Sequence, residues 1–167
     1  MDARTGSPKT VDMRALALDL LLEAERGTEY ENTLLKGTLD KYDYLNGRDK
    51  AFLKRLVDGV TERRLQLDYV LEQFSSLPVR KMKPLIRCVL RMGAYQILFM
   101  DGVPDSAACN EAVKLVKKRH FAQLSGFVNG VLRKLCSQKN ALVWPDREKE
   151  PVRFLSVRYS MPEWIVR

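Results

Sequence analysis

The sequence has few of the residues that metal and redox chemistry usually require. It contains a single histidine, His120, and three cysteines among 167 residues. Nothing near these residues has the paired Cys/His spacing of a zinc site, so no metal centre is predicted. An odd, scattered set of cysteines also gives no disulfide framework, which favours a reducing cytoplasm. We expect Cys88, Cys109 and Cys136 to act as small hydrophobic residues within helices.

Long apolar runs and glycine-rich loops are also missing. Apolar runs such as the one from Gly93 to Met100 fall well short of the ~20 residues that a membrane span needs, so no membrane partner is expected. Residues 1–10 lack the apolar core of a secretory signal and are predicted to be a disordered N-terminal segment. No glycine-rich phosphate loop or strand–glycine-turn–helix unit occurs. We therefore expect neither a self-contained enzyme nor a cofactor in this chain.

The positive charge is concentrated in the middle of the chain. The net charge is +8, and residues 61–140 carry 14 Lys and Arg against 6 Asp and Glu, which is +8 by itself. Hydrophobic residues make up 46% of the sequence, as in an ordinary soluble globular protein. This charge distribution favours a polyanionic partner, because Lys and Arg release counterions from phosphates, although many basic proteins are simply soluble.

Hydrophobic periodicity predicts helices along the whole chain. Apolar residues recur every three or four positions, and no segment alternates with a period of two, so strands are not expected. The predicted helices are 11–26, 31–39, 48–74, 84–100, 105–119 and 124–138. Segment 84–100 is apolar nearly all round, which is typical of a central helix. We predict an all-α bundle of about six to seven helices in two sub-bundles around it.

Basic residues gather in three clusters of the middle region. Residues 83, 87 and 91 follow at intervals of four, so they descend one side of the central helix, with Tyr95 one step further. We predict that this stripe binds phosphates and that the tyrosine ring stacks an unpaired base. Each cluster alone is more often a solvated face, but their convergence favours nucleic-acid binding. The clusters are Arg80, Lys81, Lys83, Arg87 and Arg91; Lys114, Lys117, Lys118 and Arg119; and Arg133 with Lys134.

Four segments together resemble the bacterial antitermination factor NusB in order and spacing. They are RMGAYQILFM at 91–100, the Val103-Pro104 turn, NEAV at 110–113 and FVNGVLRKL at 127–135. The same fold forms the N-terminal RNA-binding domain of the RsmB or Sun family of ribosomal RNA 5-methylcytosine methyltransferases. Residues 48–74, Arg133 and the segment YSMPEW at 159–164 are more similar to that second family.

The resemblance implies a NusB-like RNA-binding domain over 11–140, followed at 141–167 by a helical segment and linker toward an absent methyltransferase domain. Such enzymes bind S-adenosylmethionine on an α/β domain and attack the base with a cysteine from a Pro-Cys motif. No cysteine here follows a proline, so no catalytic residue is transferred and we expect a fragment of a longer protein. The resemblance also places Arg14 on the RNA-contacting face, with Asn129 and Arg133 on a flanking helix.

Three functions remain as alternatives. The first is the RNA-binding, substrate-positioning domain of a 16S ribosomal RNA cytosine-5 methyltransferase, and the second is a free-standing antitermination factor that binds RNA and a ribosomal protein. The third is a protein-binding helical module that uses the aromatic residues Tyr42, Tyr44 and Trp144, which we expect instead to be packing residues. We expect Gly130 to allow close helix packing, whereas Arg64 and Glu111 fit either a buried ion pair or separate surface charges.

Overall fold

The computed structural model describes residues 11–27 and 31–167, and for Glu31 and Asn32 it describes the backbone alone. The segment 1–10, predicted to be disordered, lies outside these ranges. All regular structure within them is helical, which confirms the all-α prediction. The elements are α1 (Met13–Arg26), α2 (Glu31–Lys41), α3 (Gly47–Glu62), α4 (Arg64–Glu72), η1 (Val79–Lys81), α5 (Pro84–Phe99), α6 (Asp105–Lys118), η2 (Ala122–Leu124), α7 (Ser125–Gln138), α8 (Pro151–Tyr159) and α9 (Glu163–Val166).

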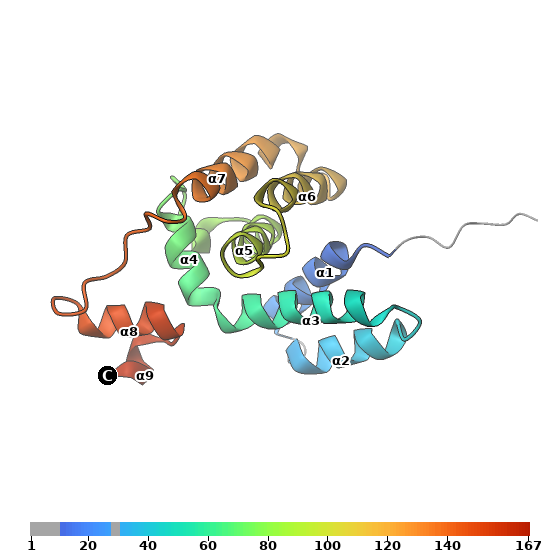
Figure 1. Cartoon of the computed structure of the whole chain (residues 1–167), viewed down its shortest axis with the longest axis horizontal. Coiled ribbons are helices and arrows are strands. Elements are labelled where there is room, and N and C mark those ends of the chain that lie inside the picture. The colour runs from blue at the N-terminus through green and yellow to red at the C-terminus, as the bar shows by residue number, and fades with distance from the viewer. Residues whose placement is uncertain (1–10, 28–30) are drawn as a thin grey trace, which may run out of the picture.

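Helix α5 is the centre of the bundle. It begins with Pro84, whose fixed φ suits the first turn of a helix, and ten of its sixteen residues are buried. Helices α1 and α3 pack on one side of α5, while α4, α6 and α7 pack on the other (Figure 1). This arrangement confirms the predicted division into two sub-bundles around the central helix.

Two glycines allow helices to approach closely. A Cβ atom added to Gly59 on α3 would collide with the ring of Tyr95 on α5, and one added to Gly93 would lie 2.7 Å from Cδ1 of Leu132 on α7. The prediction for Gly130 was wrong, because no atom lies within 4 Å of a Cβ built at that position. The glycines that matter for packing are therefore on α3 and α5.

The single helix predicted over 48–74 was also wrong, since the chain bends at Arg63 between α3 and α4. Arg63 has φ −106° and ψ 17°, outside helical values, and its guanidinium lies 4.2 Å above the ring of Phe99. The N–H groups of Leu65 and Gln66 at the start of α4 donate hydrogen bonds to the Oγ atom of Ser160, at 3.1 and 3.4 Å. The apolar period continues through the bend because α4, like α3, faces α5.

Residues 141–167 are held against α4. The indole of Trp144 stacks on the ring of Tyr69 with 5.9 Å between centroids. The side-chain amide of Gln73 exchanges two hydrogen bonds with the backbone of Val143, at 3.0 and 3.1 Å. Figure 1 shows α8 and α9 lying beyond α4, away from α6 and α7. The C-terminal segment is thus a docked part of the fold.

Two of the aromatic residues expected to be packed are at the surface. Tyr44 is 74% exposed, and Trp144 is 43% exposed despite its stacking on Tyr69. Tyr42 is half-buried and meets Tyr44 edge-on at 5.9 Å. Across the residues described, no helix has both the length and the apolarity that crossing a membrane would take.

Candidate nucleic-acid interface

The antiparallel packing of α5 and α6 brings two of the predicted basic clusters to one end of the molecule. Helix α6 packs against α5, and the turn that follows its C-terminus reaches the N-terminus of α5. The ammonium of Lys83 lies 5.7 Å from the centre of the Phe121 ring, which marks this contact. Four lysines are exposed here, and we call them the basic end: Lys81, Lys83, Lys117 and Lys118.

The turn after α6 positions the aromatic ring of the basic end. His120 adopts a left-handed conformation with φ 68°, and the N–H of Phe121 then returns to the carbonyl of Val116 at 3.0 Å. This is the hydrogen bond that commonly closes a helix C-terminus. Arg119, the last member of the predicted cluster, is engaged with Asp19 on α1 at 2.8 Å.

A second feature is a cleft of about 340 Å³ beside α4, η1 and α5, which we call the charged cleft. Four of its lining residues are arginines and three are carboxylates, which gives a net charge of +1. Three of the charged residues lie at successive intervals of four on α4, so they share one face of that helix. The lining residues are Glu25, Arg64, Asp68, Glu72, Val79, Arg80, Arg87 and Arg91.

Ion pairs fix two of the four arginines. Arg91 makes a two-point contact with Asp68, from Nε at 2.7 Å and from Nη2 at 2.9 Å. Arg87 pairs with Glu25 and also donates to the carbonyl of Met82 at 3.1 Å. Arg87 and Arg91 therefore lie on one side of α5, as their spacing predicted, but carboxylates of the protein match the charges of both.

The other two arginines of the cleft are exposed and differ from this pair. Among the side chains that the structure describes, no carboxylate oxygen lies within 4.0 Å of the guanidinium nitrogens of Arg64 or Arg80. Glu111 pairs instead with Lys114 at 3.2 Å, so Arg64 and Glu111 are separate charges. Arg64 was not predicted to belong to the basic surface, because its place in the cleft depends on how α4 packs beside η1 and α5.

A buried thiol lies beside the cleft. The Sγ atom of Cys88 donates to Oε2 of Glu25 at 3.3 Å. Burial raises the pKa of Cys88 above its ordinary value of 9.0, while the nearby charges of Arg91 and Arg87 act in the opposite direction. The thiol is consequently neutral near pH 7 and adds no negative charge to the cleft.

Tyr95 does not lie at the surface. Its side chain is 7% exposed and packs against Phe99, with 5.4 Å between ring centroids, and against Gly59. The predicted stacking of a base on this ring is incompatible with that burial, because the ring is in the core. The four-residue spacing that placed it after Arg91 could not distinguish a surface residue from one turned toward α3.

The residues proposed by resemblance lie elsewhere. Nε of Arg14 donates to Oε1 of Gln96 at 2.8 Å, and its guanidinium lies 5.1 Å from the Phe52 ring. Arg133 on α7 donates to the side chains of Asn110 at 2.8 Å and Asn129 at 3.2 Å. Asn110 is eight residues before the end of α6, which corresponds to about 12 Å along the helix axis. Arg133 and Asn129 are therefore separated from the basic end.

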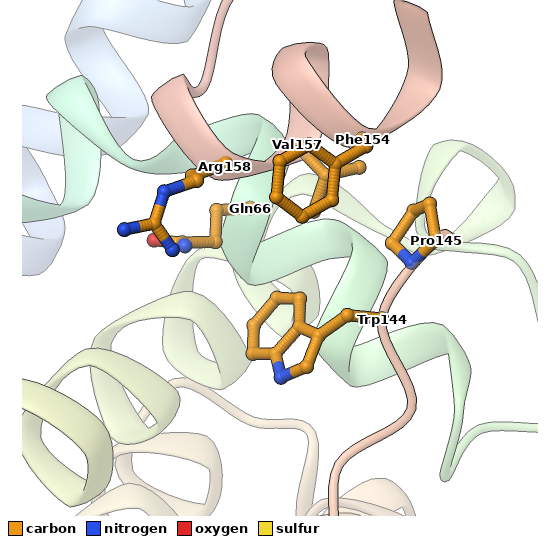
Figure 2. A pocket seen from close by; sticks show the side chains of 6 residues that line it. All are labelled: Gln66, Trp144, Pro145, Phe154, Val157 and Arg158. Atoms are coloured by element: carbon orange, nitrogen blue, oxygen red, sulfur yellow. The ribbon is translucent and has the colours of Figure 1, made fainter. Parts of the chain in front are cut away.

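A smaller cavity of about 170 Å³ lies between α4 and the C-terminal segment. Figure 2 shows the rings of Trp144 and Phe154 on opposite sides of this cavity, with Arg158 beside Gln66 at one edge. Pro145 and Val157 complete the lining. This cavity combines apolar walls with a single cation.

The exposed charges of this surface suit the binding of a polyanion. In the part of the chain that the structure describes, no group of three or more His, Cys, Asp or Glu side chains is placed to hold a metal ion. The described residues form helices without strands, so they do not supply the strand–turn–helix unit of a doubly wound nucleotide site. The described residues therefore do not form the α/β site expected for S-adenosylmethionine.

Comparison with known proteins decides the family. The sequence profile of the NusB family matches residues 11–137. The chain belongs to the NusB family. Transcription antitermination protein NusB of Pseudarthrobacter chlorophenolicus is 32% identical over 131 residues, which are 78% of this chain and 94% of that protein. A crystal structure of antitermination factors NusB and NusE in complex with dsRNA aligns with a TM-score of 0.67 at 24% identity, over 75% of this chain and 93% of that one, and so shares the fold.

A longer relative matches more of this NusB-family chain. A protein of Bacillus subtilis (strain 168), described as a probable ribosomal RNA small subunit methyltransferase B, is 36% identical over 159 residues. The match covers 95% of this chain and 35% of that protein. This NusB-family chain thus spans about a third of the length of such methyltransferase relatives.

Proposed function

We propose that this NusB-family chain is the RNA-binding, substrate-positioning domain of an S-adenosylmethionine-dependent 16S ribosomal RNA cytosine-5 methyltransferase. The domain would hold a ribosomal RNA helix or loop so that the target base meets an active site on another domain. Contacts to phosphates set the register and orientation of a nucleic acid, and such positioning lowers the entropic barrier of the reaction. We expect the protein to work in the cytoplasm, where ribosomal RNA is processed.

The observation that carries the proposal is the extent of the match beyond the NusB core. The NusB family profile ends at residue 137, whereas the match to the methyltransferase relative covers 95% of the chain. The residues after 137 include Trp144 and Ser160, both of which dock on α4. A segment that is built into the fold and shared with the longer relative supports the methyltransferase reading. We propose that the NusB-like core ends near residue 140 and that residues 141–167 are an extension docked on it.

The surface of the C-terminal segment also supports this proposal. Five large apolar side chains within residues 155–165, on α8, α9 and the turn between them, are exposed, and Trp164 is 77% exposed. Clusters of this kind usually mark contacts with another protein surface. We propose that they pack against the methyltransferase domain. They are Leu155, Tyr159, Met161, Trp164 and Ile165.

A free-standing antitermination factor remains the second candidate. The high coverage of Pseudarthrobacter NusB favours it, and the solved complex with NusE suggests that a ribosomal protein would then be a partner. The two proposals differ in their requirements for partners. An antitermination factor binds its RNA together with a ribosomal protein, whereas the methyltransferase domain acts with its own catalytic domain.

The proposal is tested by measuring fluorescence anisotropy of labelled 16S ribosomal RNA fragments as the chain is added, with and without the NusE-type ribosomal protein. The methyltransferase reading predicts binding to these fragments that does not depend on the ribosomal protein. Binding only to an antitermination RNA, and only with the ribosomal protein present, would select the second candidate. The full reading frame adds an independent test, because a following α/β domain with a Pro-Cys motif identifies the enzyme.

A further inference from the structure

We infer that the charged cleft binds a phosphate group of the RNA backbone, with Arg64 and Arg80 as its two cationic arms. This inference rests on the proposed RNA-binding function and names the site at which it acts. The spacing of basic residues in the sequence predicted that Arg80, Arg87 and Arg91 line a phosphate-binding surface. The structure brings these three residues and Arg64 into one cleft of about 340 Å³.

The four arginines of the cleft fall into two pairs. Carboxylates hold Arg87 and Arg91 in place, whereas Arg64 and Arg80 are the two arms. Arg91 is 12% exposed and is held by both oxygens of Asp68, and Arg87 is held by Glu25. Matched in this way, these two arginines mainly fix the distance between α5 and its neighbours α1 and α4. Arg64 and Arg80 are exposed on two different elements that line the cleft, α4 and η1, and are available to a ligand from solution.

The lining selects a phosphate over a nucleobase. Seven of the eight lining residues are charged, and Val79 is the remaining one. Unpaired bases stack on aromatic rings, and no aromatic side chain is among the residues that line this cleft. Guanidinium groups match the geometry of a phosphate and bind it through two parallel hydrogen bonds. The cleft is therefore expected to position RNA without reading its sequence.

Its surroundings favour a phosphate within a polymer over a free ion. Arg80 is followed directly by Lys81 and, after one residue, by Lys83, so the cleft continues into the basic end. The lysines of α6 extend the same surface. An RNA backbone that enters the cleft would meet further cations along this path, whereas a single phosphate ion would use only the two arginines.

Glu72 provides a test based on a gain of binding, which misfolding cannot imitate. Its Oε1 atom accepts a hydrogen bond from the N–H of Val79 at 3.1 Å, and a glutamine can accept the same bond. Glu72→Gln thus raises the charge of the cleft by one while keeping this contact. We expect binding to 16S ribosomal RNA fragments to tighten by about 1.5- to fivefold, the range for one exposed charge pair. The matched control is Glu148→Gln, an exposed glutamate in the loop before α8, which should leave the affinity unchanged.

Replacement of the two arms provides the complementary test. The double variant Arg64→Gln/Arg80→Gln should bind more weakly, and its slope of log K against log salt should be less negative by about 0.7–0.9, as expected for one lost phosphate contact. The control Arg48→Gln/Lys54→Gln removes the same charge from exposed positions of α3. The variant Arg64→Lys/Arg80→Lys should keep most of the salt dependence of binding, because its charge is unchanged. It should still bind more weakly than the wild type, because lysine cannot make two parallel hydrogen bonds to one phosphate.

The outcomes separate this inference from the proposed function. If the wild-type chain binds no RNA, both are overturned. If it binds RNA but Glu72→Gln matches Glu148→Gln and the arm variant matches its control, the inference alone is overturned. Competition with inorganic phosphate separates the two phosphate sources. We expect it to displace RNA no better than chloride at equal ionic strength, and a clearly stronger effect would identify a free-phosphate site instead.

Discussion

The hydroxyl oxygen of Ser160 accepts a hydrogen bond from the backbone N–H of Leu65, 95 residues earlier in the chain, at 3.1 Å. The same oxygen accepts from the N–H of Gln66 at 3.4 Å. The first N–H groups of a helix have no partner within that helix, so a serine usually caps them from the preceding position. Here the cap of α4 comes from the C-terminal segment. This contact joins the NusB core to the segment shared with the methyltransferase relative.

Loss of this cap should destabilise the protein. We expect Ser160→Ala to lower the free energy of unfolding by about 1 kcal/mol, the usual effect of removing a serine cap. Ser160 also has φ 54°, a left-handed conformation that glycine adopts more readily. Ser160→Gly should therefore recover part of the loss. Urea unfolding followed by circular dichroism measures both variants.

The control for the cap is Ser137→Ala on α7, where the exposed hydroxyl donates only to the carbonyl of Lys134 in its own helix. This variant should change the stability by less than Ser160→Ala. If Ser160→Ala has no larger effect than Ser137→Ala, the capping role assigned to Ser160 is incorrect.

Two helical glycines should respond to alanine in opposite directions. Gly59→Ala places a methyl group against the Tyr95 ring, and we expect a loss of about 1–3 kcal/mol or more from overpacking. Gly130→Ala adds a methyl group in open space on α7, and the better helix propensity of alanine should add about 0.5–1 kcal/mol. Thermal melts of the two variants, compared with the wild type, provide the measurement. A stabilising Gly59→Ala would contradict the close packing of α3 on α5.

The ion pair of Arg91 and Asp68 should show coupling in a double-mutant cycle. The two side chains are 12% and 23% exposed, so removal of one partner leaves a poorly solvated charge. We expect Arg91→Met to cost about 3 kcal/mol, and the added substitution Asp68→Leu to restore part of the stability. The free energies of unfolding of the two single variants and the double variant give the coupling. Additive losses would show that the pair does not interact as the structure indicates.

Stability should decrease in alkaline solution because of Cys136. Burial and a hydrogen bond with Cys109, whose Sγ atom is 3.6 Å away, raise the pKa of Cys136 from 9.0 to about 12. A pKa that is higher in the folded state means that the folded state holds the proton more tightly. The stabilisation is complete below about pH 9, the unfolded value, and is lost as the pH rises from there toward 12. Between pH 8 and pH 10, the wild type should lose more stability than Cys136→Ala in urea unfolding, and equal losses would contradict this assignment.

The sequence predicted the helices well because each depends on local periodicity. The apolar repeat located α1, α5, α6 and α7 to within a few residues, and Pro84 marked the start of the central helix. The bend at Arg63 was missed because its cause is distant, since the cap on α4 comes from Ser160. A hydrogen bond over 95 residues leaves no signal in a window of one or two helical turns.

The candidate site was predictable in composition but not in detail. Sequence identified the basic region and the spacing of Arg87 and Arg91 on one side of α5. It could not show that Glu25 and Asp68, on α1 and α4, would neutralise those two residues. It also could not show that Arg64 would lie with Arg80 in one cleft, because that depends on how α4 packs beside η1 and α5.

The central claim is that this chain binds ribosomal RNA through its basic surface. The most direct measurement is the affinity of the wild-type chain for 16S ribosomal RNA fragments across a salt series, with an unrelated RNA of equal length as the reference. We predict tighter binding to the ribosomal fragments and a log K that falls linearly with log salt, with a slope of about −0.7 to −0.9 for each phosphate contacted. Absence of binding, or an affinity that is independent of salt, would contradict the account.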